Sequence, residues 1–245
     1  MHFRALSCTR SSSSQKLLDR IYRLRALVFD RRLGWDVVVD NGREIDAFDD
    51  LDPTYIVVLT SAGDVAGCAR LLPATGPTML EMTFRQLLRD GRLDAHDRVI
   101  ESSRFCVDTS VAQSGAVKQI HTATLTLFAG IIEWSMRNGY DEIVTATDLR
   151  FERILKRASW PMQRLGEPRL IGEVTSVAGK LPADEESFER VRPEGYRPLT
   201  ACYTEVMKAK TALLSAADYA TRTEIGRPRS SMRLRTSTAI ATSVA

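Results

Sequence analysis

Clustered acidic residues make the segment from Asp46 to Asp52 a candidate site for a positively charged ligand. Four of its seven residues are aspartates, and like charges held this close repel one another. The repulsion is relieved when a cation binds between the carboxylates, or when water solvates each of them in a surface loop. Taken alone, the segment is compatible with both a cation site and a solvated loop.

Charged residues also interrupt two apolar segments farther along the chain. Arg70 stands inside Gly67–Pro73, and Glu101 and Arg104 stand inside Glu101–Asp108. An isolated charge is expensive to bury, so a charge in an apolar strand is rarely left unpaired. A structural salt bridge between Arg70 and Glu101 would satisfy both side chains. The alternative is that they belong to a functional site.

An aromatic residue is placed in a loop by the segment that follows the first predicted helix. Leucine, isoleucine and valine recur at i, i+3, i+4 and i+7 through residues 15–30, which predicts an amphipathic helix. The helical pattern ends at Gly34, and Trp35 comes directly after it. The sequence therefore predicts a large aromatic side chain on a loop at the end of this helix.

The elements that must position these residues alternate between strand and helix. Strands are predicted at the N-terminus and at 55–60, 65–72, 99–107, 142–147 and 170–177, and helices at 15–30, 79–88, 118–137 and 149–158. Residues 61–64 form a hairpin turn, and Gly139 is expected to cap the longest helix. That helix is apolar on almost all sides, which predicts packing against a sheet. Strands interrupted by helices, with one hairpin near the start, predict a single α/β domain with a mixed sheet.

Side chains alternate along a strand, so residues 99–107 are expected to divide between two faces of the sheet. One face would carry Glu101, Ser103 and Phe105, and the other would carry Ser102, Arg104 and Cys106. On this prediction, Glu101 and Arg104 face opposite sides of the sheet.

Charge is distributed unevenly along the 245 residues, whose apolar fraction of 44% is enough for a sizeable core. The whole chain carries a net charge of +3, but from Lys208 onward seven basic and two acidic residues give +5, which leaves −2 for residues 1–207. A nucleic-acid-binding domain would concentrate its basic residues on the fold, so this class is disfavoured. Residues 1–207 are expected to form the functional domain. Residues 208–245 are expected to be a basic, Ser/Thr-rich, disordered tail with at most a short helix near 211–220.

The remaining composition favours a cytoplasmic protein. A run of about 18 apolar residues, as a membrane span needs, does not occur, and the N-terminus lacks the apolar region of a signal peptide. Cys8, Cys68, Cys106 and Cys202 are far apart and form no CxxC pair. They are expected to be reduced thiols, and no metal site is expected.

A set of ten residues, in this order and spacing, resembles the invariant residues of the LuxI-type acyl-homoserine-lactone synthase family. They are Arg25, Phe29, Trp35, Asp46, Asp49, Arg70, Phe84, Glu101, Ser103 and Arg104. Segments 67–80, 101–108 and 145–155 also resemble the conjugal-transfer branch found in rhizobia and agrobacteria. The resemblance covers about residues 1–205 and leaves out the basic tail, which has no counterpart in a typical member.

The resemblance implies a fold similar to the GNAT N-acyltransferases, with a mixed, splayed sheet flanked by helices and an acyl chain in the cleft between two central strands. It implies S-adenosylmethionine as cosubstrate and no tightly bound cofactor. This cosubstrate is a sulfonium cation with an α-ammonium and a carboxylate, so Asp46 and Asp49 would attract the ammonium and Trp35 would face the sulfonium or adenine. Arg25 or Arg104 would hold the carboxylate. Phe29 and Phe84 complete the expected binding set.

The reaction also needs a base, because only the neutral amine has a lone pair that can attack a thioester. Glu101 is the candidate general base, acting directly or through one water. Arg70 would steady Glu101, with Ser103 as a nearby hydrogen-bonding group, and backbone N–H groups near Phe105 would hold the oxyanion. The carboxylate of the cosubstrate then displaces methylthioadenosine and closes the lactone.

An acyl site and a docking surface complete the prediction. The resemblance implies that Thr145 hydrogen-bonds an oxygen on the third carbon of a medium-length chain, although a β-branched strand former is an equally good explanation. The walls of the acyl tunnel would come from Phe105, Leu125 and Phe128, although core packing alone would also explain the apolar helix face. A basic helix face would bind the acidic acyl carrier protein as donor, unless it is an ordinary solvated face. Its residues are Arg150, Arg153, Lys156 and Arg157.

Two other functions remain open on the sequence. A different GNAT-like N-acyltransferase would use acyl-coenzyme A and carry a Gly-rich pyrophosphate loop before the long helix, but residues 108–118 hold a single glycine. A non-catalytic ligand-binding protein on this fold would be expected to have lost the charged set, yet every member is present.

Overall fold

A mixed β-sheet forms the centre of the computed structural model, which describes residues 2–11, 14–110 and 121–201. Within these residues the strand order is β11-β1-β4-β5-β6-β7-β10-β8, with β9 paired to β10. The strands are β1 (Phe3–Cys8), β4 (Thr54–Thr60), β5 (Val65–Pro73), β6 (Val99–Val107), β7 (Glu142–Asp148), β8 (Gln163–Arg164), β9 (Arg169–Ile171), β10 (Val174–Pro182) and β11 (Thr200–Ala201). A separate small hairpin joins β2 (Val39–Asp40) to β3 (Arg43–Glu44).

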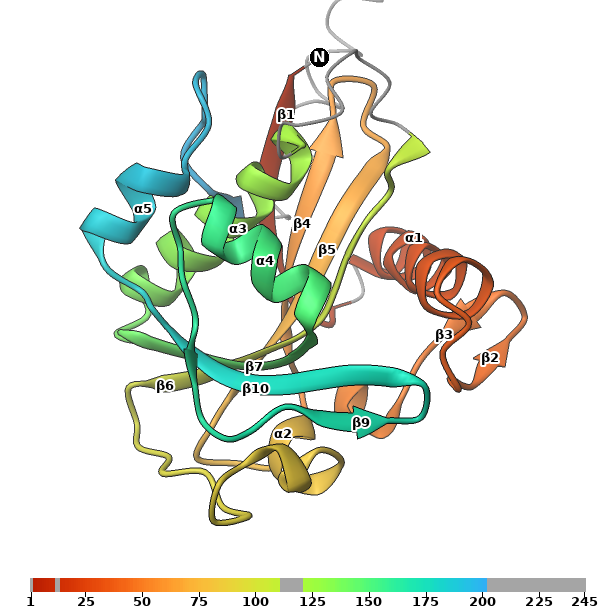
Figure 1. Ribbon diagram of the computed structural model, residues 1–245. Coiled ribbons are helices and arrows are strands. Elements are labelled where there is room, and N and C mark those ends of the chain that lie inside the picture. The colour runs from red at the N-terminus through yellow and green to blue at the C-terminus, as the bar shows by residue number, and fades with distance from the viewer. Residues whose placement is uncertain (1, 12–13, 111–120, 202–245) are drawn as a thin grey trace, which may run out of the picture. The chain divides into compact units, whose positions relative to one another are not determined.

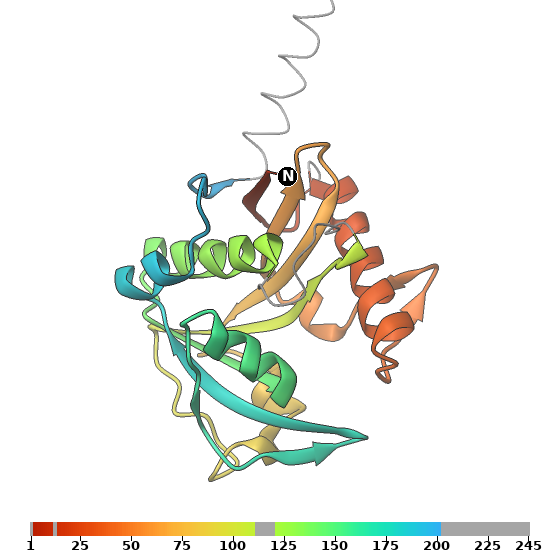
Figure 2. The same ribbon diagram turned by 45° about the horizontal axis from the view of Figure 1, so that its top comes forward.

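Helices cover both faces of the sheet, as Figures 1 and 2 show for α1 and α3. The α-helices are α1 (Gln15–Ala26), α2 (Met79–Met82), α3 (Thr122–Arg137), α4 (Leu149–Arg157) and α5 (Glu185–Val191). A π-helical segment (Leu27–Arg32) continues α1, and two 3₁₀ turns occupy Ala47–Asp50 and Arg85–Leu87. The predicted α/β fold with a mixed sheet flanked by helices is thereby confirmed.

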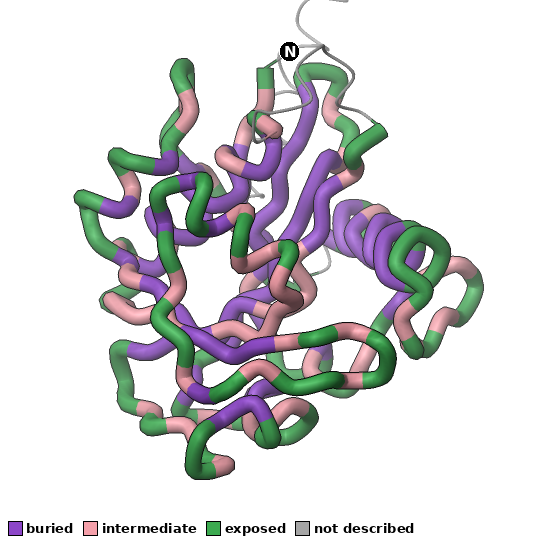
Figure 3. The backbone as a smooth tube through the Cα atoms, in the orientation of Figure 1, coloured by how far each residue is buried: buried purple, intermediate pink, exposed green. Residues whose placement is uncertain are grey.

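Packing of the long apolar helix onto the sheet builds the main core. Leu127, Phe128 and Ile132 of α3 are fully buried against apolar residues of β1, β4, β5 and β6. Gly130 lets α3 approach closely, since a Cβ there would meet Ala5 Cβ and Ile56 Cγ2 at 3.0 Å. A second cluster lies between α1 and the opposite face, and a third lies under α2. Figure 3 shows buried backbone along β4 and β5 and on the side of α1 that meets the sheet.

The two central strands β6 and β7 part from one another after a short parallel contact. They pair only at Val99–Glu101 with Glu142–Val144, although β6 runs on to Val107 and β7 to Asp148. Beyond this contact β6 stays with β5, whereas β7 stays with β10 (Figure 2). The sheet is therefore splayed between β6 and β7, because these strands stop pairing with each other and keep their outer partners.

A β-bulge in β6 breaks the alternation that the sequence predicts. The β5–β6 register passes from Cys68 opposite Cys106 to Arg70 opposite Ser103, so β6 has one extra residue. Arg104 takes the strain, with a left-handed φ of 52°. As a result, Arg104 lies on the same face as Glu101 and Ser103, whereas Phe105 packs on the α3 face. The predicted division of these side chains between faces is wrong from position 104 onward.

Several predicted elements differ in detail from the observed ones. The strand predicted at 170–177 is two strands, β9 and β10, joined by a turn in which Gly172 has a φ of +57°. The helix predicted at 79–88 is interrupted at 83–84, between α2 and a 3₁₀ turn. Asn138 is the C-cap of α3, and Gly139 follows it with a φ of +83°.

Some predictions fall on residues outside the described ranges. These are the start of the long helix at 118–120, most of the 108–118 loop, Cys202 and the tail from 208 with its short helix. Among the described residues, α3 and the other helices are all too short or too polar to span a membrane.

Candidate functional site

Three arginines and three carboxylates meet in a buried network on the α1 face of the sheet. They come from α1, β3, the 3₁₀ turn at 47–50 and its cap, β5 and β6, and they are Arg25, Arg70, Arg104, Glu44, Asp46 and Asp49. The positive and negative charges of these six described residues balance. A balanced, hydrogen-bonded cluster avoids the large cost of an unpaired buried charge.

Arg25 and Asp49 form a fully buried pair in this ion network. Arg25 Nη1 and Nη2 donate to the two Asp49 oxygens at 2.8 and 2.9 Å, and Arg25 Nε donates to Glu44 at 2.5 Å. Burial alone would raise the pKa of Asp49, but hydrogen bonds from Arg25 and the charges of Arg25 and Arg70 outweigh it and hold that pKa well below its usual range. Tyr55 adds a hydroxyl donor to Asp49 at 2.6 Å. Asp49 is therefore a permanently charged anchor for the arginines.

Arg70 connects Asp46 and Asp49 to strand β6. Its Nη1 donates to Asp46 at 2.5 Å and to Asp49 at 2.9 Å, and its Nε donates to Ser103 at 3.1 Å. Of the two alternatives for Arg70 and Glu101, the salt bridge does not form, because the strand register sets Arg70 opposite Ser103 and places Leu72 opposite Glu101. The cations that relieve the crowding of Asp46 and Asp49 are thus arginines of the chain itself.

Asp46 and Arg104 are the members of the network that water reaches. Their side chains are 20% and 12% exposed, whereas those of Arg25, Arg70, Glu44 and Asp49 are at most 1% exposed. Arg104 Nη2 lies 2.7 Å from Asp46, and Arg104 Nε donates to Glu44 at 3.0 Å. A ligand that enters from solvent therefore meets an ion pair whose two partners are both accessible.

Glu101 is almost fully buried beside this network and holds the start of α2. Its two oxygens accept the backbone N–H groups of Met79 and Leu80 at 2.9 and 2.7 Å. Burial raises the pKa of Glu101, and the two backbone hydrogen bonds and the charge of Arg70 oppose that rise. Arg70 therefore acts on Glu101 through its field rather than through an ion pair.

Aromatic rings border the exposed side of the network. Phe29 and Trp35 stack with ring centroids 5.1 Å apart and planes 11° apart, and the Arg104 guanidinium lies 5.7 Å from the centre of the Phe29 ring. Both rings are placed here by the π-helical segment that continues α1. This segment carries Phe29, and it ends just before the loop that carries Trp35. Phe84, also predicted for this site, packs instead with the cluster under α2.

Apolar side chains gather where β6 and β7 part, on the face covered by α3 and α4. Phe105 lies 5.2 Å from Phe128 and 4.7 Å from Phe151 between ring centres, and Phe128 lies 5.3 Å from Trp160. Leu125 packs against the same cluster. Thr145 is the first residue of β7 beyond its pairing with β6, and among the described residues its hydroxyl donates to the Ala146 carbonyl, at a long 3.5 Å.

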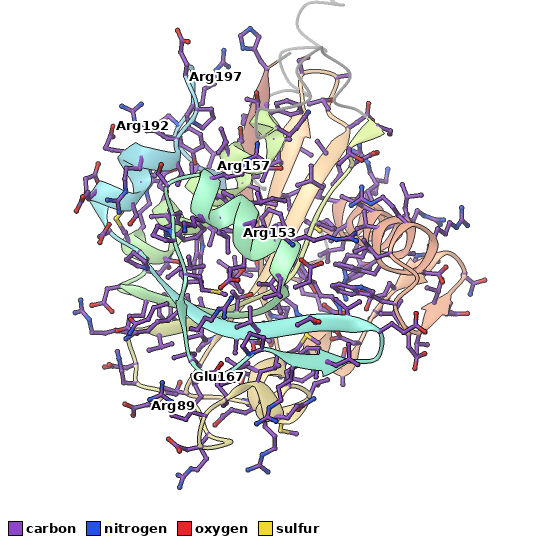
Figure 4. The ribbon with its side chains drawn as sticks, viewed as in Figure 1. Arg89, Arg153, Arg157, Glu167, Arg192 and Arg197 are labelled. Atoms are coloured by element: carbon purple, nitrogen blue, oxygen red, sulfur yellow. The ribbon has the colours of Figure 1, made fainter. Side chains whose placement is uncertain are left out.

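The four predicted basic residues of α4 are all exposed, and Figure 4 shows Arg153 and Arg157 on this helix. Glu152, an acid on the same helix, is bound by Arg164 through two hydrogen bonds of 2.7 Å. Hydrogen bonding to Arg164 lowers the pKa of Glu152. Arg164 of β8 thus pairs with the acid of α4, and the four basic residues of this helix are exposed.

Sequence reasoning missed four residues of these two sites. In the ion network, Glu44 pairs with two of the arginines and Tyr55 donates a hydrogen bond to Asp49. Phe151 and Trp160 complete the aromatic cluster. Glu44 carried a signal, since it stands two positions before Asp46 and residues two apart on an extended chain share a face. Phe151 follows the N-cap Asp148 on α4, and an inward position could have been inferred from helical periodicity.

Comparison with known proteins gives a consistent result. A family model described as autoinducer synthase matches residues 9–191. An acyl-homoserine-lactone synthase of Agrobacterium fabrum is 62% identical over 182 residues, which cover 74% of this chain and 86% of that protein. A probable acyl-homoserine-lactone synthase of Sinorhizobium fredii is 57% identical over 197 residues, covering 80% and 95%.

Solved structures agree with this assignment. The crystal structure of the AHL synthase LasI superposes with a TM-score of 0.67 at 30% identity, covering 78% of this chain and 94% of that one. A CoA-dependent acyl-homoserine lactone synthase, BjaI, solved with SAM and isopentyl-CoA, has a TM-score of 0.67 at 22% identity, covering 80% and 92%, and shares the fold. The chain therefore belongs to the autoinducer synthase family, a family of acyltransferases.

Proposed function

We propose that this protein is an acyl-homoserine-lactone synthase that acylates the amine of S-adenosylmethionine and then closes the lactone. The observation that carries the proposal is the accessible ion pair between Asp46 and Arg104 in an otherwise sealed network. The amino-acid end of adenosylmethionine carries one ammonium and one carboxylate. It can replace this pair by binding its ammonium to Asp46 and its carboxylate to Arg104, so the charge balance is kept.

The stacked rings of Phe29 and Trp35 support the rest of the cosubstrate site. A sulfonium or an adenine ring binds favourably to an aromatic face, and these rings border Arg104. Phe84 lies in a different cluster, so its predicted role in binding is the weakest of the set. BjaI, which shares this fold, was solved with SAM, and this supports the proposal of the same cosubstrate here.

Glu101 is the proposed base. Its raised pKa makes it a stronger proton acceptor, and each of its oxygens keeps a lone pair beyond the one that faces a backbone N–H. A water held by such a lone pair would pass the ammonium proton to Glu101. The neutral nitrogen then attacks the thioester carbon and the carbon–sulfur bond breaks, releasing the donor thiol. The cosubstrate carboxylate next attacks its own γ-carbon, and methylthioadenosine leaves with the electrons of the sulfonium bond.

The acyl chain is proposed to lie where β6 and β7 part. Phe105, Phe128 and Leu125 give apolar contact, and the weakly engaged hydroxyl of Thr145 is available to a 3-oxo group. This arrangement supports a medium-length 3-oxo product.

The proposed donor is acyl carrier protein rather than acyl-coenzyme A. The exposed basic residues of α4 lie on the helix whose Phe151 reaches the aromatic cluster, so a donor bound outside would be close to the acyl site. An acidic carrier protein is complementary to this surface. CoA dependence is a property of BjaI, which is 22% identical to this chain.

Incubation of the full chain with labelled adenosylmethionine and a series of acyl carrier proteins, followed by mass spectrometry, tests the proposal. Lactone and methylthioadenosine should appear in equal amounts, and more slowly when acyl-coenzyme A replaces the carrier protein. Equal or faster turnover with coenzyme A would refute the donor assignment. Adenosylmethionine binding by calorimetry without any turnover would refute the enzyme assignment and favour a ligand-binding protein.

Glu101→Gln tests the base. The variant should bind adenosylmethionine but make no lactone, because a side-chain amide is too weak a base to accept the proton of the ammonium group. Its amide NH₂ faces one of the α2 backbone N–H groups, so some loss of thermal stability is expected as well. Lactone formation at the wild-type rate would remove the base assignment.

A further inference from the structure

The sulfur of Met79 lies between two arginines of the ion network. Arg70 Nη2 donates to Met79 Sδ at 3.0 Å, and Arg104 Nη1 donates to it at 3.5 Å. Met79 is buried, so water does not compete for these contacts. A thioether is a weak but polarizable acceptor, and here two cations face it.

For Arg70, this sulfur is the last acceptor that the guanidinium needs. A guanidinium has five N–H donors, and Arg70 is completely buried. Its acceptors are Ser103 Oγ, both Asp46 oxygens, Asp49 Oδ1 and Met79 Sδ, which makes five acceptor atoms for five donors. An apolar side chain at position 79 would leave one donor of a buried cation without a partner.

The main chain of Met79 is held by the proposed base. Its N–H donates to Glu101 Oε2 at 2.9 Å, and the next N–H, that of Leu80, donates to Oε1. One residue thus contacts Glu101 through its backbone and both Arg70 and Arg104 through its side chain. Met79, the first residue of α2, therefore links the proposed base to both arginines.

We propose that Met79 is a positioning residue for adenosylmethionine. Its sulfur orients the Arg70 and Arg104 guanidinium groups, and through them Asp46, for the amino-acid end of the cosubstrate. The inference rests on the proposed function, since it assigns a further residue to the same site. The residue contacts no reacting atom in this account and acts through the arginines.

Three variants separate the role of the sulfur from the role of apolar volume. Met79→Leu keeps a similar volume but has no acceptor, and Met79→Gln has the same chain length and an amide oxygen that can accept. Met82→Leu is the matched control, because Met82 lies on the same short helix and is 70% exposed.

The Michaelis constant (KM) for adenosylmethionine is measured at saturating acyl donor, together with kcat and the KM for the donor. A KM does not depend on the fraction of protein that is folded, so partial misfolding of a variant does not imitate the effect. Met79→Leu should raise the KM for adenosylmethionine about fivefold to tenfold, the scale of one ordinary net hydrogen bond, because a thioether is a weak acceptor. Its kcat and donor KM should stay within about twofold of wild type. Met79→Gln should recover most of the loss, and Met82→Leu should match wild type.

Several results would overturn the inference. These are a Met79→Leu variant that behaves like Met82→Leu, a Met79→Gln variant as impaired as Met79→Leu, or an equal rise in both Michaelis constants. If wild type itself formed no lactone from adenosylmethionine, the proposed function would fall and the inference with it. If wild type is active and only the Met79 pattern is absent, the inference alone fails.

Discussion

Replacing Asp49 by asparagine removes a fully buried negative charge of the network while keeping the side-chain shape. Asp49 accepts two hydrogen bonds from Arg25, one from Arg70, one from Tyr55 and one from the Asp46 backbone. The amide keeps one oxygen and turns an NH₂ group toward donors. Breaking a buried pair from one side costs about 3–5 kcal/mol. With a urea m-value of about 2.5 kcal/mol/M, the unfolding midpoint should fall by about 1–2 M.

Asp50→Asn is the matched control, because the neighbouring Asp50 side chain is 72% exposed and pairs with Arg10 at the surface. Its loss should cost less than about 1 kcal/mol. The assay is urea unfolding followed by circular dichroism for wild type and both variants. If the two variants were equally stable, the network would not stabilise the fold in the way that its burial implies.

The difference in unfolding free energy between wild type and Asp49→Asn should also depend on pH, which gives a second test. The folded pKa of Asp49 lies below its ordinary value of 3.8. The stability it contributes is therefore fully present above that value and is lost as the pH falls toward the folded pKa. The difference between wild type and Asp49→Asn should be constant from about pH 6 to 8 and smaller near pH 3. A difference that grew in acid would contradict the assigned direction of the shift.

Two further predictions concern the acyl donor and its chain. Thr145→Ala should lower the ratio of 3-oxo to unsubstituted lactone in mass spectra of the products, because the hydroxyl partner of the 3-oxo group is removed; an unchanged ratio would leave Thr145 as a strand former only. Arg153→Glu with Lys156→Glu should raise the KM for acyl carrier protein about tenfold and leave that for adenosylmethionine unaltered, since a charge-complementary contact becomes repulsive. Arg89→Glu is the control, as Arg89 is exposed and lies well away from α4 in Figure 4; equal effects of both changes would mean that α4 is not the docking surface.

The order of elements could be predicted because periodicity is a local signal. Residues 55–60 and 65–72 read as a buried hairpin, and β4 and β5 form it. The prediction of one strand at 170–177 was wrong because the chain turns at Gly172, and no other residue of this segment indicates a break. Helix 79–88 was predicted as continuous, although Thr83 and Phe84 interrupt it.

The partners within the site could not be predicted, because they depend on register. A one-residue bulge at Arg104 turned this side chain to the face of Glu101, and an arginine gives no sequence signal for a left-handed conformation. The acidic run was expected either to bind a foreign cation or to be solvated. In the structure it divides: Asp46 and Asp49 bind buried arginines of the chain, while Asp50, paired with Arg10 at the surface, and Asp52 are exposed.

The claim that Asp46 and Arg104 receive the amino-acid end of adenosylmethionine can be tested by calorimetry with two ligands. Methylthioadenosine has the same nucleoside and thioether but no amino-acid end. For Asp46→Asn, the Kd of adenosylmethionine should rise about tenfold or more, whereas the Kd of methylthioadenosine should not change. Equal weakening of both ligands, or of neither, would contradict the account.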